Sequence, residues 1–127
     1  MTIWQGARGV AFVHVRDRAV AKAFYGGALA LPLAADDEYG EFYALGDGLL
    51  RVTALPDFQP SPHPVAGLHV PDVAATVRAL AGQGVRMLIY PGMGQDEAGV
   101  WASPDGRWRI AWFADPDGNV LSLSEGR

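Results

Sequence analysis

Two histidines occupy equivalent places in a weak internal repeat of the sequence. His14-Val15-Arg16-Asp17 recurs 55 residues later as His69-Val70-Pro71-Asp72. An imidazole can exchange a proton near neutral pH, and two facing imidazoles can hold a metal ion. Each histidine also lies near the end of an apolar run, where a half-exposed imidazole needs no functional explanation. We therefore favour a structural role for both and keep acid-base catalysis or metal binding as the alternative.

Arg51 is the strongest candidate for contacting an anion. It lies in the β-favouring run Leu49 to Leu55, and its planar fork of N–H donors matches a carboxylate or a phosphate. A surface arginine paired with a nearby acid is an equally weighted alternative. Trp101, in the glycine-rich stretch 91–106, offers a flat face for an aromatic or cationic ligand. Core packing or a subunit interface explains this tryptophan equally well.

The composition limits the functions that these residues can serve. The chain has 127 residues, half of them hydrophobic, which is enough for one compact domain. Ten basic and fourteen acidic residues give a net charge of -4 without any charge run, so we expect no nucleic-acid partner. The absence of cysteine excludes disulfides and thiolate chemistry. Without a secretory pattern at the start or the ~20 apolar residues of a membrane span, we expect a soluble, cytoplasmic protein with no membrane partner.

The first half of the sequence predicts a strand, a helix and a hairpin. The strand covers 9–15, Asp17 is a good N-cap, and apolar residues at helical spacing place the helix over 18–28. Two β-favouring runs, 41–45 and 49–55, flank Gly46-Asp47-Gly48, which is typical of a tight turn. Prolines then make 56–63 an extended connector.

The second half repeats this order. Asp72 caps a second helix, 85–90 predicts a strand, and 91–106 predicts a long loop. Strands over 108–114 and 119–123 enclose a turn at Asp115-Pro116-Asp117-Gly118. We therefore expect one domain over 1–127, with module one at 8–55, the connector at 56–63 and module two at 64–125.

Two motifs resemble those of a known superfamily. Trp112 to Asn119 is similar to the aromatic-x-DPDGN turn of the vicinal oxygen chelate superfamily, the glyoxalase, bleomycin-resistance and extradiol dioxygenase group. Val15-Arg16-Asp17 followed by Ala23-Phe24-Tyr25 is close to its V-x-D and FY helix. The resemblance implies an α+β fold in which two βαβββ modules form a curled mixed sheet around a cleft. It also implies a homodimer, and it leaves open whether the modules pair within one chain or between subunits.

The same resemblance implies where relatives hold a metal ion. Their four ligands come from the first and last strands of each module, and the corresponding positions here are Val10, Arg51, Val65 and Ser122. Valine has no lone pair to donate, and a guanidinium repels a cation. We therefore expect no metal and no cofactor.

Three functions follow, in this order of preference. The first is a protein that binds a small organic ligand, anionic or aromatic, in the cleft and does no chemistry. The second is a metal-independent enzyme that uses His14, His69 or Glu41 as general acid or base. A metal-dependent lyase, isomerase or dioxygenase ranks last. The residues that we expect to contact the ligand are Phe12, His14, Arg51, His69, Trp101 and Ser122.

Overall fold

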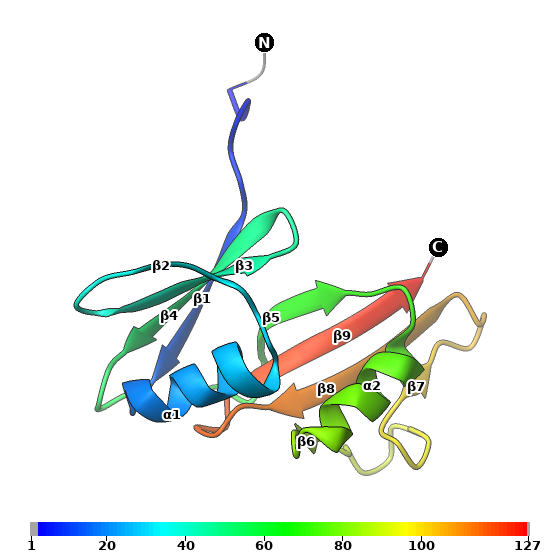
Figure 1. The fold of residues 1–127 in the computed structure, drawn as a ribbon. Helices are drawn as coiled ribbons and strands as arrows, with labels where there is room; N and C mark the ends of the chain where they lie inside the picture. The colour runs from blue at the N-terminus through cyan, green and yellow to red at the C-terminus, as the bar shows by residue number, and fades with distance from the viewer. Residues whose placement is uncertain (1–2, 127) are drawn as a thin grey trace.

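The computed structural model describes residues 3–126 and contains two sheets with a helix packed on each (Figure 1). The first sheet has four strands in the order β1-β4-β3-β2. The second has five, in the order β5-β9-β8-β6, with β7 paired to β8. The elements of the first module are β1 (Val10–Val15), α1 (Arg18–Lys22), the π-helix η1 (Ala23–Ala28), β2 (Leu33–Asp36), β3 (Gly40–Leu45) and β4 (Gly48–Ala54). Those of the second are β5 (Pro64–His69), α2 (Val73–Gly82), β6 (Arg86–Met87), β7 (Trp101–Ala102), β8 (Trp108–Ala114) and β9 (Val120–Gly126).

The predicted first helix has the expected extent, but its second half is wider than an α-helix. Asp17 caps α1 by accepting a hydrogen bond from the backbone N–H of Val20 at 3.0 Å. The π-helical part contains Gly26, where an added Cβ would lie 3.4 Å from the ring of Tyr43. The helix thus packs against the buried tyrosine of β3 at this position.

The second module differs from the sequence prediction around β6. The strand predicted over 85–90 is reduced to Arg86–Met87, and the predicted loop contains the short strand β7. The reason is Gln95, whose side chain accepts from the backbone N–H of Tyr90 at 2.6 Å and donates to the carbonyl of Leu88 at 3.0 Å. A side chain thus satisfies backbone groups that a longer strand would have paired.

The two modules meet within one chain, where β1 and β5 are in contact. Both helices lie on the same side of the strands (Figure 1). The turn after β8 joins the modules, because Asp115 accepts a hydrogen bond from Tyr25 of η1 at 2.7 Å and Asn119 donates to the carbonyl of His14 at 2.8 Å. The observed α+β architecture confirms the predicted curled pair of βαβββ modules.

The strand β2 was missed by the sequence prediction. All four of its residues are exposed, and Leu-Ala-Ala-Asp has no alternation of apolar and polar side chains. It is the outer strand of its sheet, where only one edge is hydrogen bonded. Within residues 3–126, no helix has the length and apolar content that crossing a bilayer requires.

Candidate functional site

Alternate residues of β1 lie on the helix side and on the open face of the sheet. Val13 and Val15 are each 1% exposed and belong to the core, whereas Phe12 is 60% exposed. Alternation along a strand sends Val10, Phe12 and His14 to the face away from the helix. The burial pattern of β1 follows this alternation, with the buried valines on the helix side.

Arg51 lies between two phenylalanines on this open face. The register pairs Arg51 of β4 with Phe12 of β1 on one side and with Phe42 of β3 on the other. Residues directly opposite each other point to the same face of a sheet. The guanidinium carbon of Arg51 lies 4.6 Å from the centroid of the Phe42 ring, which places the cation over the negative face of the aromatic ring.

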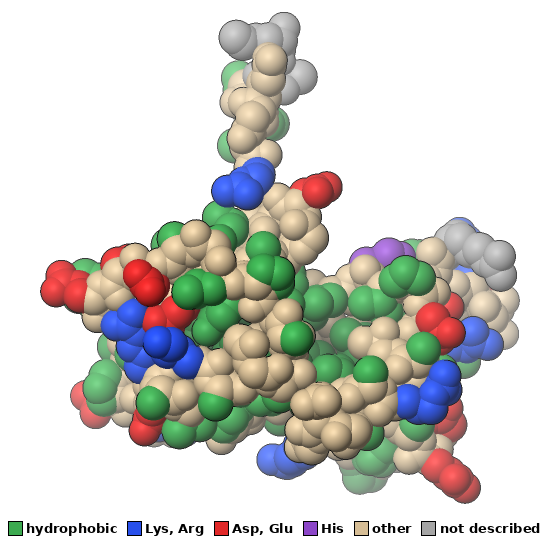
Figure 2. Space-filling model, in the orientation of Figure 1, with side chains coloured by type: hydrophobic (Ala, Val, Ile, Leu, Met, Phe, Trp, Pro, Cys, Tyr) green, Lys and Arg blue, Asp and Glu red, His purple; other side chains and the backbone are tan. Residues whose placement is uncertain are grey.

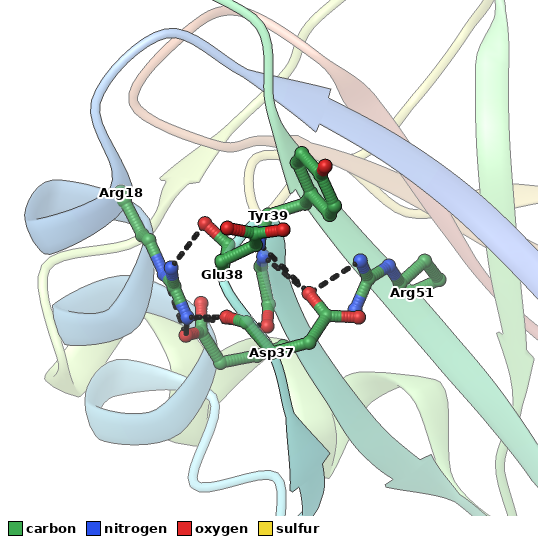
Figure 3. A network of polar contacts seen from close by, with 7 residues as sticks. Arg18, Asp37, Glu38, Tyr39 and Arg51 are labelled. Carbon is green, nitrogen blue, oxygen red and sulfur yellow. Dashed lines mark hydrogen bonds and ion pairs between the residues drawn. The ribbon is translucent and has the colours of Figure 1, made fainter.

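The guanidinium of Arg51 is buried and only partly satisfied. The residue is 9% exposed, and its Nη2 donates to Oδ1 of Asp37 at 2.9 Å (Figure 3). Its Nη1 is buried and has no hydrogen-bond partner within residues 3–126. The alternative of an arginine paired with a nearby acid holds, but the arginine is not at the surface. The buried Nη1 is left without a partner after that pairing.

Asp37 forms a tight turn between β2 and β3. Its Oδ1 accepts hydrogen bonds from the backbone N–H groups of Tyr39 at 2.8 Å and Gly40 at 3.0 Å, besides the bond from Arg51. The Arg51 hydrogen bond, followed by that of Tyr39, lowers the pKa of the Asp37 carboxyl. Asp37 therefore stays ionised and holds one edge of the arginine in place.

A second arginine stabilises the same turn by hydrogen bonds from the helix side. Arg18 of α1 donates to the carbonyl oxygens of Asp37 at 2.6 Å and Glu38 at 3.0 Å, and to Oε2 of Glu41 at 2.6 and 2.8 Å (Figure 3). The Glu41 hydrogen bond raises the pKa of Arg18. Glu41 is 1% exposed and is held by a cation on the face opposite to Arg51. The hypothesis that Glu41 acts as a general acid or base in the cleft receives no support from this placement.

Sequence reasoning missed Arg18 and Asp37. The available signal for Asp37 was the spacing Asp37-Glu38-Tyr39-Gly40, because an aspartate that precedes a turn readily bonds to backbone N–H groups two and three residues later. Nothing in the sequence indicated that Arg18 reaches a turn about twenty positions away.

The open face of the second sheet carries Ser122 in a close-packed row. Ser122 of β9 pairs with Gly67 of β5 and with Trp112 of β8. A Cβ added at Gly67 would lie 2.6 Å from Oγ of Ser122, so the glycine makes room for the serine. The ring of Trp112 meets Tyr90 edge to face, with centroids 5.4 Å apart.

The two repeat-related histidines have different neighbours. The ring of His14 lies 5.5 Å from that of Phe58. His69 shares a 3.0 Å hydrogen bond with Oγ of Ser124 and lies 6.2 Å from the ring of Trp108. In the part of the chain that the structure describes, no ring contact or hydrogen bond joins the two histidines. The expected contact of each histidine with a ligand stays a prediction.

Trp101 lies in a strand rather than in a loop. It belongs to β7 and pairs with Ile110 of β8, and its side chain is half-buried. The expectation that Trp101 extends from a free loop is therefore wrong, because backbone pairing with β8 fixes its position. Its expected contact with a ligand stays a prediction.

The residues at the four positions where relatives are expected to hold a metal ion do not suit one. Val10 lies on the open face, Val65 is half-buried at a register shift in β5, and Ser122 is the only neutral oxygen donor of the set. Arg51 places a fixed positive charge at the fourth position. No cluster of three or more His, Cys, Asp or Glu side chains that could hold a metal occurs between residues 3 and 126.

Similar proteins are found among solved structures only. No family model and no curated protein matches the chain. A glyoxalase/bleomycin resistance protein from Catenulispora acidiphila is 22% identical with a TM-score of 0.71, covering 94% of this chain and 98% of that one. A glyoxalase/bleomycin resistance protein/dioxygenase from Alicyclobacillus acidocaldarius is 16% identical, with a TM-score of 0.72 and coverage of 94% and 90%.

The fosfomycin resistance protein FosX from Listeria monocytogenes is 13% identical, with a TM-score of 0.71 over 94% of this chain and 92% of that one. Identities this low establish the shape of the chain and not its ligand. Taken with the two βαβββ modules, they show that the chain has the glyoxalase/bleomycin-resistance fold.

Proposed function

We propose that the protein binds a small organic anion at Arg51, on the open face of the first sheet, without using a metal ion. The observation that carries this proposal is the unpaired Nη1 of the buried guanidinium. Buried donors without a partner are uncommon and cost about 1–3 kcal/mol, more when charged. A ligand that brings an acceptor oxygen to Nη1 removes this cost, which gives the site a preference for anions.

The surroundings of Arg51 favour an anion with an apolar or aromatic body. Phe12 lies next to Arg51 and is 60% exposed, and Val10 on the same face of β1 is 39% exposed. Access to Nη1 requires a neighbouring side chain to move, and Phe12 has the exposure to do so. A planar ligand can then stack on Phe12 while its carboxylate reaches the guanidinium.

The charge of Asp37 limits which anions fit. Asp37 already neutralises the charge of Arg51 through Nη2, so a second negative charge on the ligand would be repelled by the aspartate. The site therefore suits a monoanion better than a dianion. A single carboxylate on an aromatic ring is the simplest compound with these properties.

Binding can be tested by calorimetry and thermal shift with three matched probes: benzoate, benzamide and phthalate. Fosfomycin, a small phosphonate, joins the set because FosX is a fosfomycin resistance protein. A ligand present at 100 times its dissociation constant stabilises the fold by about 2.7 kcal/mol. We expect benzoate to bind more tightly than benzamide and phthalate. Equal binding of the neutral amide would contradict a charge-based site.

The role of Arg51 is tested with Arg51→Met, which keeps most of the side-chain volume, and with Arg51→Ala. Either change is expected to raise the dissociation constant of the anion more than tenfold. This corresponds to a loss of about 1.4 kcal/mol of binding free energy. Arg109→Met is the matched control, because the Arg109 side chain is 59% exposed and its ion pair with Glu125 spans 3.9 Å. Unchanged affinity in both Arg51 variants would exclude this residue as the anchor.

The enzyme alternative has no specific observation in its favour. Glu41 faces the helix and is bound by Arg18, and the two histidines have separate structural neighbours. We also propose that the protein acts as a homodimer, in agreement with what the sequence resemblance implies.

A further inference from the structure

The turn between β2 and β3 places an acid beside the proposed anion site. Asp37 approaches Arg51 from the β3 side, whereas Phe12 lies on the β1 side, because the strand order is β1-β4-β3-β2. Figure 2 shows acidic and basic side chains gathered near this turn, and in Figure 3 the side chains of Asp37 and Arg51 point toward one another. A ligand at Arg51 therefore meets a negative charge as well as a positive one.

The carboxylate of Asp37 can accept further hydrogen bonds. Its Oδ1 takes two bonds from backbone N–H groups of its own turn and one from Nη2 of Arg51. Its Oδ2 accepts none from residues 3–126. The side chain is 47% exposed, so a ligand can reach it from solvent. The group that pairs best with such an oxygen is a cationic N–H donor.

Arg51 has the opposite requirement. Its buried Nη1 has no hydrogen-bond partner in the described part of the chain, and it needs an acceptor. A simple carboxylate supplies that acceptor but is repelled by the charge of Asp37. A carboxylate with an ammonium group on the adjacent carbon avoids this conflict, because each of its charges can face the opposite charge of the protein.

We propose that the ligand is a zwitterion with an aromatic body, of the aromatic α-amino acid class. Its carboxylate binds Nη1 of Arg51, its ammonium group binds the carboxylate of Asp37, and its ring stacks on Phe12, which is 60% exposed. These three groups diverge from the ligand as the three side chains do around the site, with Arg51 between the other two. The inference rests on the proposed function, because it keeps the ligand carboxylate on Arg51, and it adds a specificity role for Asp37.

Titration calorimetry on the full chain compares L-phenylalanine with two analogues. The first, 3-phenylpropanoate, lacks only the ammonium group, and the second, 2-phenylethylamine, lacks only the carboxylate. We expect L-phenylalanine to bind at least about fivefold more tightly than 3-phenylpropanoate, which is the effect of one opposite charge about 4 Å away in water. We expect 2-phenylethylamine to bind more weakly than L-phenylalanine, because it leaves Nη1 of Arg51 without an acceptor. Equal affinities of L-phenylalanine and either analogue would overturn the proposal.

Asp37→Asn tests the charge of the acid separately from the shape of the turn. Asparagine keeps a side-chain oxygen for the backbone N–H groups that Asp37 binds. The variant is expected to abolish the preference for L-phenylalanine by weakening its binding and strengthening that of 3-phenylpropanoate. Glu38→Gln is the matched control, because Glu38 is the next residue, is exposed and loses the same charge. An unchanged preference in Asp37→Asn would overturn the proposal, and so would an equal loss of preference in Glu38→Gln.

Arg51→Met separates this inference from the proposed function. The variant is expected to lose binding of both carboxylates. If 3-phenylpropanoate binds in a manner that depends on Arg51 and the ammonium group adds nothing, the zwitterion is excluded and the anion site remains. If neither carboxylate binds the wild-type protein, both proposals are wrong.

Discussion

The phenol of Tyr25 donates a 2.7 Å hydrogen bond to Oδ2 of Asp115, and this bond joins a helix of the first module to a turn of the second. Tyr25 is fully buried and Asp115 is 4% exposed. The same carboxylate accepts hydrogen bonds from the side chain and backbone of Asn119. The turn motif that resembles the one of the vicinal oxygen chelate superfamily therefore also connects the two halves of the molecule.

Replacing Tyr25 by phenylalanine should weaken this connection. The change leaves a buried carboxylate oxygen with one partner fewer, and such a loss costs about 1–3 kcal/mol. Burial, together with the charge of Asp115, raises the pKa of Tyr25, so the phenol remains a donor throughout the usual pH range. Urea unfolding measures the loss. Tyr39→Phe is the control, because Tyr39 is 62% exposed, and equal losses in the two variants would contradict a specific role for the bond.

Removing Arg18 and removing Glu41 should lower the free energy of unfolding by different amounts. Glu41→Gln keeps an acceptor near Arg18, whose side chain is 34% exposed and can be hydrated, so we expect a loss of about 1–3 kcal/mol. Arg18→Met leaves a carboxylate that is 1% exposed without its cation, which is the more costly state. Unfolding curves at pH 7 should therefore rank Arg18→Met as the less stable variant. The reverse order would contradict the expectation that loss of the Arg18 cation is the more costly change.

Much of the fold followed from the sequence because local chemistry specifies it. Asp17 and Asp72 cap their helices by accepting from backbone N–H groups three residues later, a bond that depends only on nearby residues. β2 was not predicted, because its exposed residues carry no periodic signal.

The candidate site was predicted less well, because it depends on pairing between distant segments. Arg51 was identified, but its burial follows from Phe42 and Asp37, which the register and a turn bring to it. Trp101 was assigned to a loop because a two-residue strand has no sequence pattern of its own.

The lowered pKa of Asp37 predicts a pH dependence with a defined sign. A carboxyl whose pKa is lower in the folded state contributes stability above its unfolded pKa, about 3.9, and loses that contribution as pH falls through the folded pKa. The stability difference between wild type and Asp37→Asn should therefore be constant near pH 6 and shrink below about pH 4. Since Arg51 is the largest cause of the shift, carboxyl NMR titration of Arg51→Met should show a higher pKa for Asp37. An unchanged Asp37 pKa in that variant would mean that the backbone bonds alone hold the carboxylate.

Replacing Gly40 and Gly27 by alanine should change the stability of the protein in opposite directions. A Cβ on Gly40 would collide with the backbone carbonyl of Val52 in the neighbouring strand, whereas a Cβ on Gly27 meets nothing within 4 Å. Gly40→Ala must therefore push β3 away from β4, next to the turn that holds Arg51, and we expect it to lower both stability and benzoate affinity. Gly27→Ala lies in η1, where alanine restricts the unfolded chain, and a gain of about 0.5–1 kcal/mol is expected. Urea unfolding of the two variants decides this, and a stable Gly40→Ala protein that binds benzoate normally would show that the close approach of these strands is not required.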